Sequence, residues 1–141
     1  MAYEFQVTID STAPHPLADW WAEALGWERE PSDEAFIQRM VDEGHATAAE
    51  TMQHNGQLVW VTGAAIRNPT GPAPRVLFQW VPEPKTVKNR VHLDVRVGTD
   101  NIEAEVARLT ARGATVLHHG RQGPYSWVTI ADPEGNELCL T

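Results

Sequence analysis

The most promising residues for chemistry lie in one alternating segment, residues 89–97. His92, Asp94 and Arg96 point to one side of an extended strand here, and apolar residues point to the other. An imidazole, a carboxylate and a guanidinium in one row suit proton transfer and stabilisation of an anion. A half-buried strand also turns polar residues to water, so Asp94 is either a general base or the partner in a structural ion pair.

The N-terminal segment repeats this arrangement in a weaker form. Its apolar set is Phe5, Val7 and Ile9, and its polar set is Gln6, Thr8 and Asp10. We therefore expect the polar rows of both strands to line one shared cavity.

The first half of the chain contains a series of predicted strands and helices. After a strand at residues 5–10, apolar residues at helical spacing predict a helix that begins near Pro14–Pro16 and ends at Gly26. Strands are predicted at residues 27–30, 58–62 and 75–81. Between them, we expect a helix up to Glu43, a second helical piece at 46–52 and a turn at Asn55-Gly56.

The second half has the same order of elements. The strand at 89–97 precedes a helix that carries Ile102, Val106 and Leu109 and ends at Gly113. Strands follow at 114–119, 125–131 and 137–141, with a loop at 120–124. The pattern predicts an α+β fold of two tandem βαβββ modules in one domain, residues 1–141. Module 1 spans 1–82 with an insertion at 32–57, the linker spans 82–88, and module 2 spans 89–141.

Bulk properties exclude several classes of partner. The chain has 141 residues, a formal charge of −8 and no basic run, which argues against nucleic acid and anionic membranes. Its one cysteine, Cys139, cannot form an internal disulfide. No apolar run is long enough to span a membrane. We expect a soluble, cytoplasmic protein with a small-molecule ligand.

Several motifs resemble one known superfamily. They are the C-terminal Asp-Pro-Glu-Gly-Asn-Glu-Leu-Cys-Leu at 132–140, the two helices at 17–27 and 105–114, and the segments 78–85 and 89–94. Together with the paired modules, they resemble the vicinal oxygen chelate superfamily, and most of all its small bacterial glyoxalase-like and bleomycin resistance-like proteins. The resemblance covers nearly the whole chain except residues 32–57.

The resemblance implies a divalent metal in a cleft between the modules, and often a homodimer. By position, its four ligands are Gln6, Gln79, His92 and Cys139. Such a metal keeps open positions for substrate oxygens and stabilises an anion. Two amides and a thiol hold hard divalent ions poorly, and His92 with Cys139 alone makes a weak zinc site. The alternatives are a pocket histidine paired with Asp94 and a small buried cysteine.

Two functions remain open. The first is a lyase or isomerase acting on a small oxygenated molecule, with His92 and Asp94 as acid and base and Arg96 or a weakly held metal stabilising the anion. Its expected ligand-binding residues are Gln6, Gln79, Trp60, Trp127, Arg96 and Glu137. The second is a non-catalytic protein that binds a drug-like molecule, to which the six tryptophans are suited. His54, within the insertion, supplies a ligand or base only if that segment folds over the cleft.

Overall fold

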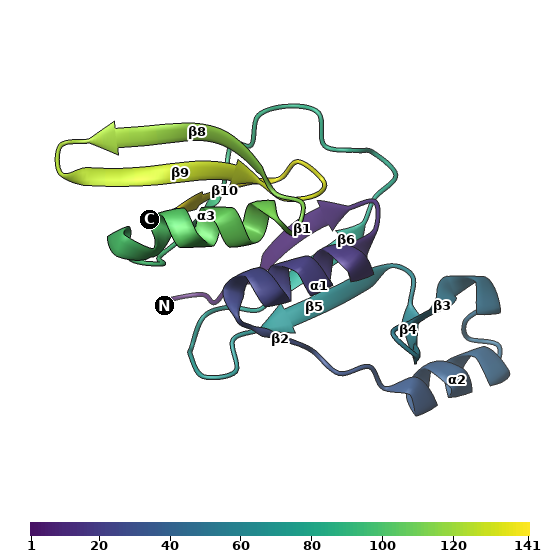
Figure 1. The fold of residues 1–141 in the computed structure, drawn as a ribbon. Helices are drawn as coiled ribbons and strands as arrows, with labels where there is room; N and C mark the ends of the chain where they lie inside the picture. Colours follow the sequence, from purple (N-terminus) through teal and green to yellow (C-terminus); the bar gives the residue numbers. More distant parts are fainter. The chain divides into compact units, whose positions relative to one another are not determined.

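Two compact units, Met1–Glu83 and Pro84–Thr141, make up the chain. The computed structural model describes all residues, 1–141. Each unit is built on a four-stranded sheet (Figure 1), with the strand orders β1-β6-β5-β2 and β7-β10-β9-β8. In both sheets, the first and last strands of the unit lie side by side.

The first sheet has one helix-covered face. β1 (Val7–Ser11) runs parallel to β6 (Val76–Trp80), and β5 (Gly63–Arg67) lies antiparallel between β6 and β2 (Glu28–Arg29). Helix α1 (Pro14–Leu25) contacts β5 and β6, and its buried Trp21 joins Ile66 and Phe78 in the core. A proline in the first turn and left-handed Gly26 (φ 67°) mark its ends, as the sequence predicts.

An insertion between β2 and β5 forms its own small substructure. It contains α2 (Glu34–Asp42), the 3₁₀ turn η1 (Ala48–Glu50) and a hairpin of β3 (Thr51–His54) and β4 (Gln57–Trp60). Asn55 and Gly56 form the hairpin turn with positive φ angles of 50° and 77°. A two-residue turn of this kind matches the right-handed twist of the strands it connects.

The second unit repeats the first without an insertion. β7 (Leu93–Val95) runs parallel to β10 (Glu137–Leu140), followed across the sheet by β9 (Tyr125–Ala131) and β8 (Thr115–Gln122). The 3₁₀ turn η2 (Thr99–Asn101) leads into α3 (Ile102–Thr110), which contacts β8, β9 and β10. Leu109, Ile130, Leu138 and Leu140 are at most 1% exposed and form the core of this unit.

The predicted α+β fold of paired βαβββ modules is confirmed, whereas the single domain of residues 1–141 stays a prediction. The strand predicted at 58–62 is present as β4, but it ends at Trp60 and pairs with β3 outside the four-stranded sheet. The sheet strand is β5, whose small residues Ala64 and Ala65 have a weaker strand propensity than the neighbouring Leu-Val-Trp-Val.

Other differences concern the lengths and types of elements. The helical piece predicted at 46–52 is η1 followed by β3, and the loop predicted at 120–124 is a hairpin turn limited to residues 123–124. The strand predicted at 89–97 shrinks to Leu93–Val95, and Val91 is 82% exposed. β7 is short because only three residues of β10, 138–140, pair with it. No helix has the length and apolar character needed to cross a membrane.

Candidate functional site

A cluster of His92, Asp94 and Cys139 lies where β7 meets β10. Asp94 and Cys139 are directly opposite each other in the parallel register, so their side chains share one face of the sheet. His92, two residues before Asp94, lies on the same face. One potential ligand atom from each residue lies within 4.8 Å of the others. The sequence placed His92 and Asp94 in one row and, through the resemblance, His92 and Cys139 at one metal site. The structure brings all three together.

The three side chains differ in exposure and partners. The side chains of His92 and Asp94 are 39% and 57% exposed, and His92 Nδ1 lies 3.0 Å from Asp94 Oδ1. Cys139 is buried, and its Sγ lies 3.2 Å from Thr129 Oγ1 on β9. An accessible imidazole–carboxylate pair therefore stands beside a buried thiol.

The cluster fits a divalent metal, and zinc best among the common ions. Imidazole, carboxylate and thiolate are all zinc ligands, and two ligands of one tetrahedral zinc lie roughly 3.5 Å apart. Atoms that already lie within 4.8 Å of one another need only small side-chain movements to reach that spacing. Asp94 supplies the strong third ligand that the set of Gln6, Gln79, His92 and Cys139 lacks.

The two amides of the expected ligand set belong to the first unit. Gln6 accepts a hydrogen bond from Arg75 Nη1 at 3.2 Å and donates one to Thr8 Oγ1 at 3.5 Å. Gln79 is exposed on β6, opposite Asp10 of β1. Their role as ligands stays a prediction, as does that of Arg96, which is exposed just after β7.

Glu137, predicted to bind ligand, is 6% exposed and carries three bonds within its own unit. Its carboxylate accepts the backbone N–H of Asn89 at 2.6 Å and lies 2.7 Å from Lys88 Nζ and 3.4 Å from Lys85 Nζ. Burial alone raises the pKa of this carboxyl, but the bonds from Lys88 and Asn89 and the two lysine charges outweigh it and lower the pKa to about 2. Glu137 thus fastens the segment before β7 to the start of β10.

The two tryptophans predicted to contact ligand lie in different units. Trp127 of β9 covers Gly120 of β8, where an added Cβ would lie 2.0 Å from the indole Cε2. Trp60 ends β4 and lines a cavity in the first unit.

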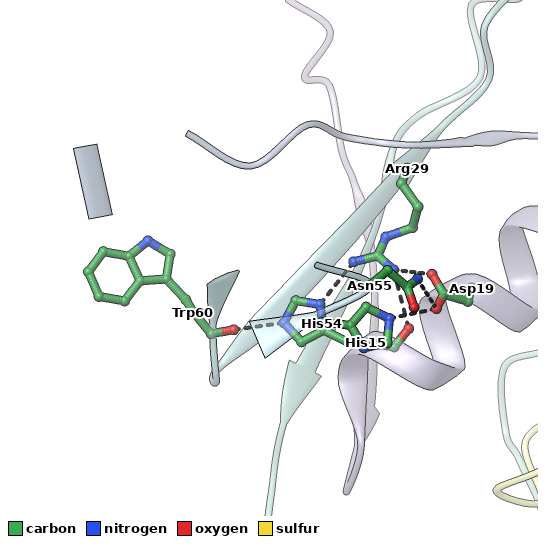
Figure 2. Close-up of polar contacts among 6 residues, drawn as sticks. All are labelled: His15, Asp19, Arg29, His54, Asn55 and Trp60. Atoms are coloured by element: carbon green, nitrogen blue, oxygen red, sulfur yellow. Dashed lines mark hydrogen bonds and ion pairs between the residues drawn. The ribbon is translucent and has the colours of Figure 1, made fainter. Parts of the chain in front are cut away.

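A second polar cluster, which the sequence did not reveal, joins α1 to the insertion (Figure 2). Asp19 forms an ion pair with Arg29 Nη1, accepts from His54 Nε2 at 2.6 Å and accepts from Asn55 Nδ2 at 3.2 Å. His15, 2% exposed, bonds Arg29 Nη2 through Nδ1 at 2.9 Å and the carbonyl oxygen of Trp60 through Nε2 at 2.7 Å. Through these bonds, the cluster joins α1 to β2, to the β3–β4 hairpin and to the hairpin's turn.

These partners define the protonation of both imidazoles. A guanidinium only donates, so His15 Nδ1 must accept, and Nε2 carries the proton given to the Trp60 carbonyl. Burial and the nearby Arg29 charge lower the pKa of His15, although its bond to the Trp60 carbonyl acts to raise it. The ring is therefore neutral. The carboxylate of Asp19 accepts, so His54 donates from Nε2.

The pKa of Asp19 is lowered as well. Burial acts to raise this pKa, but the hydrogen bond from His54 and the charge and bond of Arg29 outweigh that effect. Asp19 therefore stays ionised and keeps its bonds to both partners at neutral pH.

A cavity of about 360 Å³ opens beside this cluster, within the first unit. His54, Trp60 and Phe36 line it, together with the ion pair of Arg75 and Glu30, whose Nη2 and Oε2 atoms are 3.0 Å apart. One sequence signal for this site existed, because His15 and Asp19 are four residues apart on one helix and so share a face. The contribution of His54 depends on how the insertion folds, which has no comparable signal.

Comparison with known proteins agrees with the fold. Residues 6–141 match the family model of the glyoxalase-like domain. No curated protein matches the sequence.

Solved structures of the same fold share little sequence identity with this chain. A glyoxalase/bleomycin resistance protein/dioxygenase family enzyme from Burkholderia phytofirmans PsJN has 14% identity and a TM-score of 0.61, with 96% of this chain and 94% of that chain covered. The fosfomycin resistance protein FosX from Mesorhizobium loti has 7% identity and a TM-score of 0.63, with 99% and 90% covered.

A mutant FosX from Listeria monocytogenes, complexed with Mn(II) and 1S,2S-dihydroxypropylphosphonic acid, has 8% identity and a TM-score of 0.66, with 99% and 91% covered. The predicted resemblance to the vicinal oxygen chelate superfamily is confirmed by these neighbours and by the family match. Because the family model spans nearly the whole sequence, the chain belongs to the glyoxalase-like domain family.

Proposed function

We propose that this protein binds a small oxygenated organic molecule at His92, Asp94 and Cys139 and promotes a proton transfer on it, as a lyase or isomerase does. The observation that carries the proposal is the convergence of three ligand atoms within 4.8 Å on one face of the second sheet. The Mn(II) and dihydroxypropylphosphonic acid in a FosX structure of this fold support a metal and an oxygenated ligand for the superfamily.

The exposure of His92, Asp94 and Cys139 indicates a different role for each side chain. Cys139 is buried and hydrogen-bonded to Thr129, so it suits a fixed ligand at the floor of the site. His92 and Asp94 are exposed enough to meet a substrate. His92, Asp94 and Cys139 would hold a divalent ion, which would supply Lewis-acid chemistry toward a substrate oxygen.

Without a bound ion, the His92–Asp94 pair retains acid–base chemistry. The Asp94 carboxylate, 3.0 Å from Nδ1, accepts the N–H of the imidazole and orients the ring. The ring can then accept a substrate proton at Nε2, which meets only solvent or substrate. His92 would be a ligand with the ion bound and a proton acceptor without it, so both forms of the site depend on His92.

Exchange of a carbon-bound proton tests this proposal without knowledge of the natural substrate. Dihydroxyacetone in D₂O is a suitable probe, because loss of a proton beside its carbonyl is visible by proton NMR. We expect zinc-loaded wild-type protein to accelerate the exchange and His92→Ala to abolish the acceleration. His45→Ala is the matched control, since the side chain of His45 is 65% exposed and pairs only with Glu43.

Two results would contradict the proposed chemistry: no acceleration by the wild type, or equal acceleration by His92→Ala. Saturable binding of the probe without exchange would instead support the non-catalytic binding protein. The expected homodimer stays a prediction, to be checked by light scattering.

A further inference from the structure

We propose that the cavity of the first unit is a second ligand site, which binds a neutral aromatic molecule through a hydroxyl group donated to His54 Nδ1. This site is built only from residues of the first unit and is independent of His92, Asp94 and Cys139. Its elements are a positioned hydrogen-bond acceptor, aromatic walls and charges that are already neutralised within the chain.

The acceptor is the ring nitrogen of His54 that faces no partner in the protein. Nε2 donates to Asp19 at 2.6 Å, which leaves the lone pair on Nδ1, and no hydrogen bond of the chain reaches Nδ1. The side chain of His54 is only 16% exposed and lines the cavity.

The orientation of His54 is fixed by more than one contact (Figure 2). Asp19, its partner, is itself held by Arg29 and by Asn55 Nδ2 at 3.2 Å. The ring of His15 lies against that of His54, with 5.1 Å between centroids. Because both nitrogens of His15 are engaged, only His54 offers a ring atom to a ligand.

The charges of the cavity argue against an anionic ligand. Arg29 is paired with Asp19, and Arg75 is paired with Glu30 at 3.0 Å, so neither guanidinium lacks a carboxylate partner. Asp33, which also lines the cavity, accepts from the backbone N–H of Phe36 and adds a negative charge. A phosphate or carboxylate would meet this charge without a free cation to compensate for it.

The size and walls of the cavity favour an aromatic body. Its volume of about 360 Å³ lies within the range of small-molecule sites, which start at roughly 300 Å³. Trp60 and Phe36 line it, and aromatic rings pack well against one another in offset or edge-to-face geometry. A phenol-like molecule combines such a ring with the hydroxyl donor that His54 Nδ1 requires.

Two probes that differ by a hydroxyl group test the proposal. Binding of 4-methoxyphenol and of methoxybenzene to the full chain would be measured by NMR titration at about pH 8, above the ordinary pKa of imidazole and below that of a phenol. One hydrogen bond predicts that 4-methoxyphenol binds wild type roughly three- to tenfold more tightly than methoxybenzene. In His54→Phe, which keeps an aromatic ring but has no hydrogen-bond acceptor, we expect this preference to disappear. Asp19 remains bonded to Arg29 and Asn55 in this variant.

Only the His54 variant should lose the preference. His45→Phe serves as the control and should bind both probes as the wild type does. Equal binding of the two probes by wild type, or an unchanged preference in His54→Phe, would overturn the proposal. Nitrogen NMR of the wild-type imidazole gives a check that needs no variant. Protonated Nε2 and unprotonated Nδ1 at His54 are expected, and the opposite tautomer would refute the assignment.

Discussion

Glu137→Gln tests how the second unit holds the segment that leads into β7. The substitution keeps the size of the side chain and removes its charge. Wild-type Glu137 is 6% exposed and accepts from Asn89 N at 2.6 Å and from Lys88 Nζ at 2.7 Å, with Lys85 Nζ at 3.4 Å. A glutamine oxygen can replace one of these bonds, but its NH₂ group then faces donors.

The cost follows from these contacts. Hydrogen bonds to a charged group contribute about 1.5–3 kcal/mol each, and removal of one partner of a fully buried pair costs about 3–5 kcal/mol. The side chains of Lys85 and Lys88 are 27% and 58% exposed, so water solvates them when the carboxylate is gone. We therefore expect the free energy of unfolding to fall by about 2–3 kcal/mol at neutral pH, below the fully buried range.

The pH dependence gives a second, independent signature. The folded pKa of Glu137 is about 2, below the value of about 4.3 for an unfolded glutamate. The stabilisation by this carboxylate is complete above the unfolded pKa and is lost as the pH falls through the folded pKa. The difference between wild type and Glu137→Gln should hence be constant near neutrality and shrink between about pH 4.5 and pH 2.

Urea unfolding followed by tryptophan fluorescence measures both effects. Glu28→Gln is the control, because Glu28 and Arg67 form an exposed pair, worth less than about 1 kcal/mol. A loss in Glu137→Gln no larger than that of the control, or a loss that stays the same down to pH 2, would refute the assigned role of Glu137.

Three further changes probe other contacts. Gly120→Ala places a Cβ 2.0 Å from the Trp127 indole and should lower the free energy of unfolding by about 1–3 kcal/mol, measured by thermal unfolding. Adding Trp127→Leu should recover part of this loss. No loss in Gly120→Ala would contradict the close contact. Asp132→Asn weakens a turn in which the carboxylate accepts from the backbone N–H groups of residues 134 and 136 at 2.8 and 2.9 Å, and should cost about 1–3 kcal/mol by the same measurement. Asp19→Ala removes the acceptor of His54 and should speed amide exchange across the β3–β4 hairpin, while unchanged exchange would show that the cluster does not hold the insertion.

Much of the fold was predictable because its periodicity is local. Alternation in β1 and helical spacing in α1 depend on residues close in sequence. Gly26 and the Asn55-Gly56 turn are predictable because few other residue types adopt their left-handed backbone conformations. β5 was not predictable, because Gly63, Ala64 and Ala65 gain their strand conformation from pairing with β6.

The site was predictable only where its residues follow the repeat. His92 and Cys139 follow from the paired modules, and Asp94 from alternation with His92. Glu137 shares the face of Cys139, yet its burial comes from the conformation of residues 85–89, which no pattern specifies. The cluster of Asp19 and His54 joins residues 35 positions apart and depends on the path of the insertion.

The proposed function requires His92, Asp94 and Cys139 to form one divalent-ion site, which a cobalt(II) titration tests. Cobalt replaces zinc in sites of this kind, and a thiolate ligand gives an intense near-ultraviolet absorption. We expect this band to saturate at one equivalent in wild type, to vanish in Cys139→Ser and to weaken in His92→Ala and Asp94→Asn. Absence of the band in wild type, or its persistence in Cys139→Ser, would contradict the claim.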